Sequence, residues 1–405
     1  MVKSSNPWLR GLLRAGKKQQ RSNARALTIL FTPAKPPKAS KPVKAVKAVK
    51  AVKTAAAKTV APRKKPAPAS TSSPSPLLKP LALGRPSTPA SVQRAPLDAP
   101  GTAVGKWLTS HCAAPAEPGA LTLKRMSYWL YLPERAPAPA GWPLVVMLHG
   151  CEQSATLFAQ GTRMNRHAEK AGYAVLYPQQ SMSSHPQRCW KWYDRATQQG
   201  GGDVPTLVAL VQKVLVNYPI DPRRVYICGM SAGAAMAHIV ALNHPRLFAA
   251  LGMHSGPLFG AGHSALGALA VMQHGAAGQA DSAIAGVLAR QPGFPPLPTV
   301  LIQGEDDPVV RPVNQVLLER QAMLVNRLGP GSRTEVLHKP GNRRSHPYWL
   351  RDVYRGRALM LRVARIAELK HAWSGGDQEL SFNSGAGPDA SKLLLDFFRR
   401  HRRAS

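Results

Sequence analysis

Continuous apolar runs, separated by amphipathic segments, dominate the chain beyond about residue 120. The runs lie at 128–132, 143–148, 173–177, 225–228, 249–253 and 299–303. Runs that are apolar throughout are typical of strands buried on both faces of a parallel sheet. The segments 204–217, 232–243, 312–328 and 390–399 instead place apolar residues at helical spacing. This alternation predicts an α/β fold with a doubly wound, mostly parallel sheet.

The pattern of residues 33–100 is different, because Pro, Ala, Ser and Lys dominate and lysine recurs every third residue over 41–53. Such a segment cannot bury enough apolar surface to offset its chain entropy, so we expect it to be disordered. Residues 7–31 carry a broken apolar stripe that predicts a short basic helix, with a helix that forms only transiently as the alternative. We therefore expect a basic tail over 1–120 and a catalytic domain over 121–403.

The charge is concentrated in the N-terminal tail. The net charge is +34, and residues 1–95 hold 21 Lys and Arg with no Asp or Glu, whereas the remainder holds 33 basic and 20 acidic residues. A block of this kind predicts non-specific contact with a polyanion or a polymer granule through residues 1–95. A solvated tail without a partner is the alternative.

The four cysteines are too few for a disulfide scaffold in 405 residues. No apolar stretch reaches the ~18 residues of a transmembrane helix, so we expect no transmembrane segment. The apolar run at 27–31 is short and is followed by a lysine-rich tract, which argues against a secretory signal. These features favour a cytoplasmic location, free or on a granule, with an extracellular one as the alternative.

The most informative motif is Gly229-Met-Ser231-Ala-Gly233, which follows the strand 225–228 and opens the helix 232–243. A sharp strand-to-helix turn holds such a serine in a strained conformation at a helix N-terminus, and the glycines avoid collisions that Cβ atoms would cause. The motif predicts a nucleophilic Ser231 in an α/β-hydrolase fold.

A serine that attacks a carbonyl carbon needs two donors for the developing oxyanion. One should be the backbone N–H after the nucleophile, here that of Ala232. The second should come from the loop after the strand 143–148, where His149-Gly150-Cys151 lies. We expect the Cys151 amide to be this donor, with Gly150 allowing the close approach.

The acid should follow the serine in this fold, and the histidine should follow the acid. Glu305, Asp306 and Asp307 come directly after the strand 299–303. We favour Asp307 over Asp306, because Asp307 precedes the segment 308–310 that returns to the core. The carboxylates not used should be solvated turn residues.

Four histidines lie beyond Asp307, namely His338, His346, His371 and His401. His371 opens a glycine-rich loop after an apolar stretch, where a histidine can reach the serine. His338 lies in a strand-like run, His346 in an arginine-rich loop and His401 in the basic C-terminal end. His371 is the predicted base.

Together these segments resemble the poly(3-hydroxybutyrate) depolymerase family, which is itself similar to feruloyl and acetyl-xylan esterases. The resemblance covers roughly 122–400 and rests on the segments 148–154, 188–193, 229–233, 253–256, 304–310 with Asn314, and 371–376. It implies the Ser231–Asp307–His371 triad and an oxyanion amide at Cys151. It also implies that Cys189 lies near Cys151, within range of a disulfide in an oxidising compartment, and that Trp190, Trp192 and Trp373 contact the substrate.

The expected activity is hydrolysis of carboxylic esters through an acyl-enzyme, on poly(3-hydroxybutyrate), another polyhydroxyalkanoate or their oligomers. A feruloyl or acetyl-xylan esterase is the first alternative. The second is a polyanion- or granule-binding protein with a vestigial hydrolase domain. No metal or organic cofactor is implied. The segment 256–298 is either a mobile lid over the cleft or ordinary connecting helices.

Overall fold

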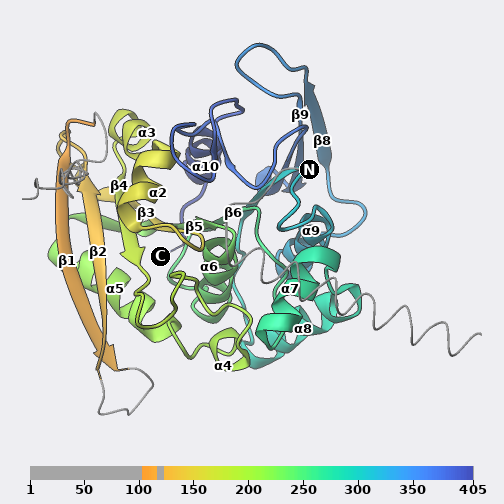
Figure 1. Cartoon of the computed structure of the whole chain (residues 1–405), viewed down its shortest axis with the longest axis horizontal. Coiled ribbons are helices and arrows are strands. Elements are labelled where there is room, and N and C mark those ends of the chain that lie inside the picture. Colours follow the sequence, from red (N-terminus) through yellow and green to blue (C-terminus); the bar gives the residue numbers. More distant parts are fainter. Residues whose placement is uncertain (1–102, 116–122, 405) are drawn as a thin grey trace, which may run out of the picture. The chain divides into compact units, whose positions relative to one another are not determined.

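The computed structural model describes residues 103–115 and 123–404, which are built around one ten-stranded sheet (Figure 1). The strand order is β1-β2-β4-β3-β5-β6-β7-β10-β9-β8. The strands are β1 (Lys106–Pro115), β2 (Leu123–Leu132), β3 (Trp142–Leu148), β4 (Ala174–Gln179), β5 (Ile220–Met230), β6 (Ala250–His254), β7 (Thr299–Gly304), β8 (Thr334–Lys339), β9 (Tyr348–Arg355) and β10 (Ala358–Ile366). In this sheet order, neighbouring strands from β4 through β3, β5, β6 and β7 to β10 are parallel. The outer pairs, β1–β2, β2–β4, β10–β9 and β9–β8, are antiparallel.

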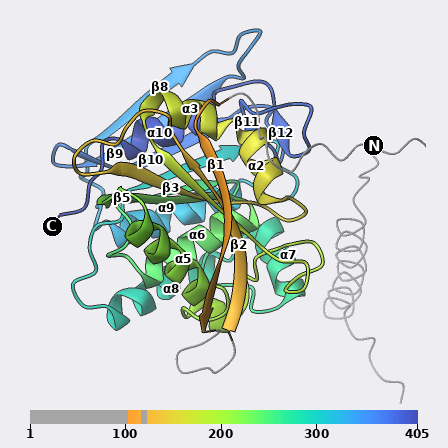
Figure 2. The same cartoon turned by 90° about the vertical axis from the view of Figure 1, so that its left-hand side faces the viewer.

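Helices cover both faces of the sheet, because successive side chains of a buried strand point to opposite sides. In β3, Val145 and Met147 join one apolar cluster, whereas Leu144, Val146 and Leu148 join the other. On the first face lie α2 (Ala155–Thr162), α3 (Met164–Ala171) and α10 (Ala390–Phe398), and on the second α5 (Val204–Asn217), α6 (Ala232–Asn243), α7 (Ala265–His274), α8 (Ala277–Arg290) and α9 (Val313–Val325) (Figure 2). A short helix, α4 (Arg195–Gln198), precedes α5.

The predicted doubly wound α/β sheet is confirmed, and each of the six apolar runs falls in a strand, β2 to β7. The segment 256–298 forms the helices α7 and α8. Of the tail expected over 1–120, residues 1–102 and 116–120 lie outside the described residues. Within them, no helix is long and apolar enough to cross a membrane.

The structure adds elements that the apolar pattern did not predict. Strand β1 lies before residue 121, where the domain was expected to begin, and it pairs with β2 over ten residues. Strands β9 and β10 also carry charged residues that interrupt their apolar runs. Arg362 of β10 lies opposite Asp352 of β9, and its Nε donates to Asp352 Oδ1 at 2.7 Å. This pairing lets a charged side chain stay within the sheet.

Candidate active site

The turn between β5 and α6 holds Ser231 in a backbone conformation that few non-glycine residues adopt. Its φ is 55° and its ψ is −123°. The flanking glycines permit the turn: a Cβ at Gly229 would lie 2.6 Å from the carbonyl carbon of Gly233, and a Cβ at Gly233 would lie 2.1 Å from the carbonyl oxygen of Leu148. The strain is thus a consequence of β5, α6 and β3 meeting at one point, where the serine side chain is lifted off the sheet.

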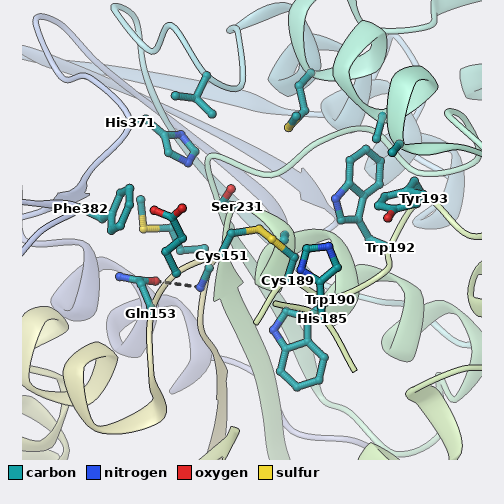
Figure 3. Close-up of a pocket in the computed structure, with 18 residues that line it drawn as sticks. Cys151, Gln153, His185, Cys189, Trp190, Trp192, Tyr193, Ser231, His371 and Phe382 are labelled. Atoms are coloured by element: carbon teal, nitrogen blue, oxygen red, sulfur yellow. Dashed lines mark hydrogen bonds between the residues drawn. A yellow bond between two sulfur atoms is a disulfide. The ribbon is translucent and has the colours of Figure 1, made fainter. Parts of the chain in front are cut away.

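Ser231 opens into a cavity lined by both polar and apolar side chains (Figure 3). His371 and Phe382 lie on one side of Ser231, and Trp192 and Tyr193 lie on the other. The remaining lining residues are Gly150, Cys151, Glu152, Gln153, His185, Cys189, Trp190, Met230, Ala232, Ala265, Ala268, Met272 and Val309. Helix α7 therefore contributes to the wall of the cavity, as a lid over 256–298 would.

Asp307 and His371 form a hydrogen-bonded pair at this cavity. Nδ1 of His371 lies 2.8 Å from Oδ2 of Asp307, although the two residues are 64 positions apart. Oδ1 of Asp307 accepts from the backbone N–H groups of Val309 and Val310, both at 2.9 Å. Gln303 Nε2 donates to Oδ2 at 3.0 Å. With Nδ1 bonded to the carboxylate, Nε2 of His371 is left for the cavity.

The environment of Asp307 keeps its carboxyl ionised. Burial by itself raises the pKa of Asp307. The neighbouring His371, through its charge and its hydrogen bond, and the amides of Val310 and Val309 outweigh burial and hold the pKa below its ordinary value. The competing Glu305 and Asp306 are exposed. Of the three acids, the structure brings Asp307 to His371.

The other three histidines lie away from this pair. His338 stacks on Trp349 at the exposed β8 edge, with ring centroids 5.0 Å apart. His346 lies 3.4 Å from a carboxylate oxygen of Glu368. His401 packs on the ring of Phe397. Among the described residues that line the cavity, these three histidines do not occur.

The loop after β3 brings Cys151 to the cavity that Ser231 also lines. The Gly150 N–H donates to Gln153 Oε1 at 2.8 Å, and the Glu152 N–H donates to the Gln187 carbonyl at 2.6 Å. The two flanking amides are thus held by protein acceptors, and the Cys151 N–H lies between them. Ala232 is the first residue of α6, so its N–H has no acceptor within the helix.

His149 fixes the other side of this loop. Its Nε2 accepts the Gln180 N–H at 3.1 Å, so Nδ1 carries the proton and donates to the Gly150 carbonyl at 2.8 Å. The His149 carbonyl accepts from Trp190 Nε1 at 2.9 Å. Burial lowers the pKa of His149 to about 4, with Arg188 contributing. The ring therefore stays neutral and keeps both bonds at neutral pH.

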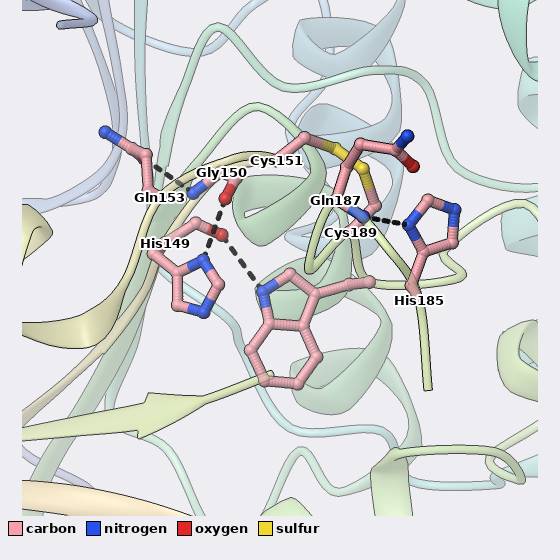
Figure 4. The surroundings of a disulfide bond; sticks show 8 residues. His149, Gly150, Cys151, Gln153, His185, Gln187 and Cys189 are labelled. Atoms are coloured by element: carbon pink, nitrogen blue, oxygen red, sulfur yellow. Dashed lines mark hydrogen bonds between the residues drawn. A yellow bond between two sulfur atoms is a disulfide. The ribbon is translucent and has the colours of Figure 1, made fainter. Parts of the chain in front are cut away.

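A disulfide joins Cys151 to Cys189, with Cα atoms 4.4 Å apart (Figure 4). It ties the loop after β3 to the loop that carries Trp190. Gln187, in the same loop, accepts from Glu152 and donates its N–H to His185 Nδ1 at 3.3 Å. The segment of Cys151 and Glu152 is thus attached to the second loop by one disulfide and one hydrogen bond.

The three tryptophans have different positions. Trp190 and Trp192 are buried and line the cavity. Trp373, expected to contact the substrate, is fully buried and is not among the residues that line the cavity. It packs edge-on against Phe158, stacks on His254 and donates from Nε1 to Ser391. Its place two residues after His371 suggested the cavity, but its side chain points into the core.

Three residues at the site were given no role of their own from the sequence. Gln153 holds the Gly150 amide, Gln303 holds Asp307, and His254 contacts the backbone of both Ser231 and Ser374. Their positions at the ends of strands or in the loops that follow were visible in the sequence. Within the described residues, no cluster of three or more His, Cys, Asp or Glu is arranged to hold a metal ion.

The family described as Esterase PHB depolymerase matches residues 126–334, which is about half of the chain and includes Ser231 and Asp307. Poly(3-hydroxyalkanoate) depolymerase C of Paucimonas lemoignei is 34% identical over 183 residues, covering 44% of this chain and 43% of the relative. Feruloyl esterase B of Neurospora crassa is 34% identical over 131 residues, covering 32% and 43%. Probable acetylxylan esterase A of Aspergillus fumigatus is 32% identical over 130 residues, covering 32% and 34%.

The chain spans less than half the length of these three relatives. Among solved structures, the acetyl xylan esterase from Aspergillus awamori matches 72% of this chain and 99% of its own, with a TM-score of 0.55 and 19% identity. This likeness, together with the sheet order and the helices on both faces, shows an α/β-hydrolase fold. From its match to the family over residues 126–334, the chain belongs to the Esterase PHB depolymerase family.

Proposed function

We propose that this protein is a serine hydrolase of carboxylic esters, with Ser231 as nucleophile, His371 as general base and Asp307 as the acid that orients it. One observation carries the proposal: a serine strained at a strand-to-helix turn lines the same cavity as a histidine whose Nδ1 is bonded to a buried carboxylate. The family to which the chain belongs supports the same chemistry.

The reaction proceeds through an acyl-enzyme. Nε2 of His371 removes the Ser231 proton as Oγ attacks the ester carbonyl carbon. The amides of Ala232 and Cys151 stabilise the oxyanion, and Asp307 stabilises the protonated imidazole. His371 gives its proton to the leaving alcohol. It then takes a proton from water as the water oxygen attacks the acyl-enzyme carbonyl carbon. The bond between the acyl carbon and Ser231 Oγ breaks, His371 returns its proton to Oγ, and the acid leaves.

For the substrate we propose poly(3-hydroxybutyrate), another polyhydroxyalkanoate or their oligomers. A relative named as a poly(3-hydroxyalkanoate) depolymerase supports this class. The apolar side chains of Met272, Val309 and Phe382 around the cavity suit the short alkyl groups of such polyesters. Feruloyl and acetylated-sugar esters are the second candidate class, favoured by the relatives named feruloyl and acetylxylan esterases.

Residues 1–95 lie outside the described residues, and their proposed role is to hold the enzyme on a polyanion or a polymer granule by charge alone. The competing proposal makes this binding the main function and the hydrolase domain vestigial. Ester turnover by the folded domain separates the two proposals.

The test is hydrolysis of p-nitrophenyl butyrate by the wild-type protein and by Ser231→Ala. Loss of the nucleophile should lower kcat by on the order of 10⁶-fold, with unchanged circular dichroism. Equal turnover by the two proteins would overturn the proposal. Comparing kcat/KM on 3-hydroxybutyrate oligomers, ethyl ferulate and acetylated xylan then identifies the substrate class.

A further inference from the structure

His254, the last residue of β6, lies between the nucleophile and the loop of the general base. Its backbone carbonyl accepts the Ser231 N–H at 2.9 Å. Its ring Nε2 accepts the Ser374 N–H at 3.3 Å. Ser374 follows His371 by three residues, so a single fully buried residue contacts both segments that carry the reacting side chains.

The ring of His254 is held on its other atoms as well. It stacks on Trp373 with centroids 5.0 Å apart and planes inclined by 22°. Because Nε2 accepts a hydrogen bond, Nδ1 carries the proton and donates to Ser255 Oγ at 3.1 Å. Trp373 is itself bonded through Nε1 to Ser391 Oγ at 3.2 Å. The ring therefore has one orientation, with its acceptor directed at the Ser374 amide.

We propose that His254 is a positioning residue, which keeps the turn of Ser231 and the loop of His371 at the separation that proton transfer between them requires. This inference rests on the proposed ester hydrolase function. Proton transfer demands that the two side chains meet at hydrogen-bond distance, and a misplacement of about 1 Å can cost on the order of 10²-fold in rate. Because His254 bonds to both segments, it restricts this misplacement.

His254 can hold both segments because its imidazole is neutral. The pKa of His254 is lowered to about 3, chiefly by burial and then by the nearby His371, whereas Asp307 opposes the shift. A neutral ring retains the Nε2 lone pair for the Ser374 amide. It also adds no positive charge beside His371, which must itself become positive during attack.

His254→Met and His254→Gln test the proposal as a pair. Methionine fills a similar volume without an acceptor for the Ser374 amide, whereas the glutamine amide oxygen can reach the position of Nε2. The matched control is His238→Met. His238 is another buried histidine, which lies in α6 and packs on Phe259. Among the described residues it makes no hydrogen bond to either catalytic segment.

The measurements are kcat and KM on p-nitrophenyl butyrate, with kcat expressed per serine titrated by a fluorophosphonate. The His254→Met protein should lose about 10- to 100-fold in kcat, with KM within about threefold of wild type. His254→Gln should recover most of that loss. His238→Met should change kcat less than about twofold, whatever its effect on Tm.

Two results would overturn the role of His254: a Met variant with wild-type kcat, or Met and Gln variants that lose kcat equally. If the Met variant does not fold, His254→Asn replaces it, because the shorter amide does not reach Ser374. If the wild-type protein hydrolysed no ester, the proposed function itself would be overturned, because Ser231 would then not act as a nucleophile.

Discussion

Nδ1 of His371 lies 2.8 Å from Oδ2 of Asp307, and both backbone amides that approach Asp307 bond to its other oxygen, Oδ1. The carboxylate is thus divided into two parts. Oδ1 anchors it to the turn of Val309 and Val310, and Oδ2 is left for His371 and Gln303. The histidine is therefore oriented by a carboxylate that is itself fixed.

This division predicts different effects for two adjacent acids. Asp307→Asn should lower kcat by on the order of 10⁴-fold, because an amide at that position can favour the wrong imidazole tautomer. Asp306→Asn should lower kcat less than about threefold, since Asp306 is exposed and its side chain bonds nothing at the site. Steady-state kinetics on p-nitrophenyl butyrate measure both. The opposite ranking would move the acid to Asp306.

The disulfide should matter for kcat as well as for stability. Cys151→Ser combined with Cys189→Ser removes the bond between the two loops beside Ser231. The unfolding free energy should fall by about 2–4 kcal/mol. The Cys151 amide should become less well placed, which predicts a loss in kcat of about tenfold. Urea unfolding and initial rates measure the two effects.

A matched control for the disulfide is Cys228→Ala, because Cys228 is a buried free thiol in β5. Burial raises the pKa of its thiol well above the ordinary value, so it stays protonated. This variant should be less stable than the wild type. Its kcat, and the change in kcat when a dithiol reductant is added, should match those of the wild type. Unchanged kcat in the double serine variant would show that the loop needs no covalent support.

Buried neutral histidines predict acid-sensitive stability. Burial is the main cause that lowers the pKa of His149 and His401 to about 4, and that of His238 and His254 to about 3. Between about pH 6.5 and these values, the unfolded chain binds protons that the folded chain does not. The free energy of unfolding must therefore fall as pH falls through this window, by at most about 1.4 kcal/mol per pH unit for each histidine.

Urea unfolding from pH 7 to pH 4.5 measures this slope, and His238→Met should reduce it. The ring of His238 is suited to the test because its Nδ1 is buried without a hydrogen-bond partner among the described residues. A slope that is identical in wild type and in this variant would mean that His238 has the same pKa in the folded protein as in the unfolded chain.

Much of the candidate site could be proposed from the sequence, because its residues lie in short motifs at strand ends. The turn at Ser231 and the glycine-rich loop at His371 each fall within a few residues. The role of His254 was not predictable, since it depends on β6 lying beside β5, with His254 opposite Met230. Trp373 was misplaced for a related reason: adjacency to His371 does not say which way a side chain points.

Prediction of the sheet has the same limit, because some strands depend on their neighbours. Strands β2 to β7 carry apolar runs that indicate strands without knowledge of their neighbours. Strands β9 and β10 become comprehensible only as a pair, because Arg362 needs Asp352 opposite it to remain buried. Strand β1 has no comparable apolar run, and it depends on the edge of β2 and on α5. Lys213 of α5 donates to the His111 carbonyl of β1 at 2.8 Å.

The place of β1 determines where the N-terminal tail can be removed. Deletion of residues 1–102 should leave kcat and KM on p-nitrophenyl butyrate unchanged, since the proposed catalytic residues lie beyond Pro143 and β1 begins at Lys106. Deletion of residues 1–115 removes β1 and uncovers ten residues of β2. This longer deletion should lower Tm by several degrees, which thermal unfolding of the two truncated proteins compares.

The 1–102 deletion also tests the proposed role of the tail. Residues 1–95 carry 21 positive and no negative side chains, so binding to a phosphate backbone should release counterions and fall steeply with salt, without sequence preference. Full-length protein should bind duplex DNA at 50 mM salt and lose at least about tenfold in affinity by 200 mM. The truncated protein should bind far more weakly, as should a full-length variant with residues 1–95 replaced by an uncharged Gly/Ser segment of equal length.

The same three proteins compared on poly(3-hydroxybutyrate) granules decide whether charge or the polymer surface itself retains the enzyme. Equal binding by all three to DNA and to granules would assign the tail no tethering role.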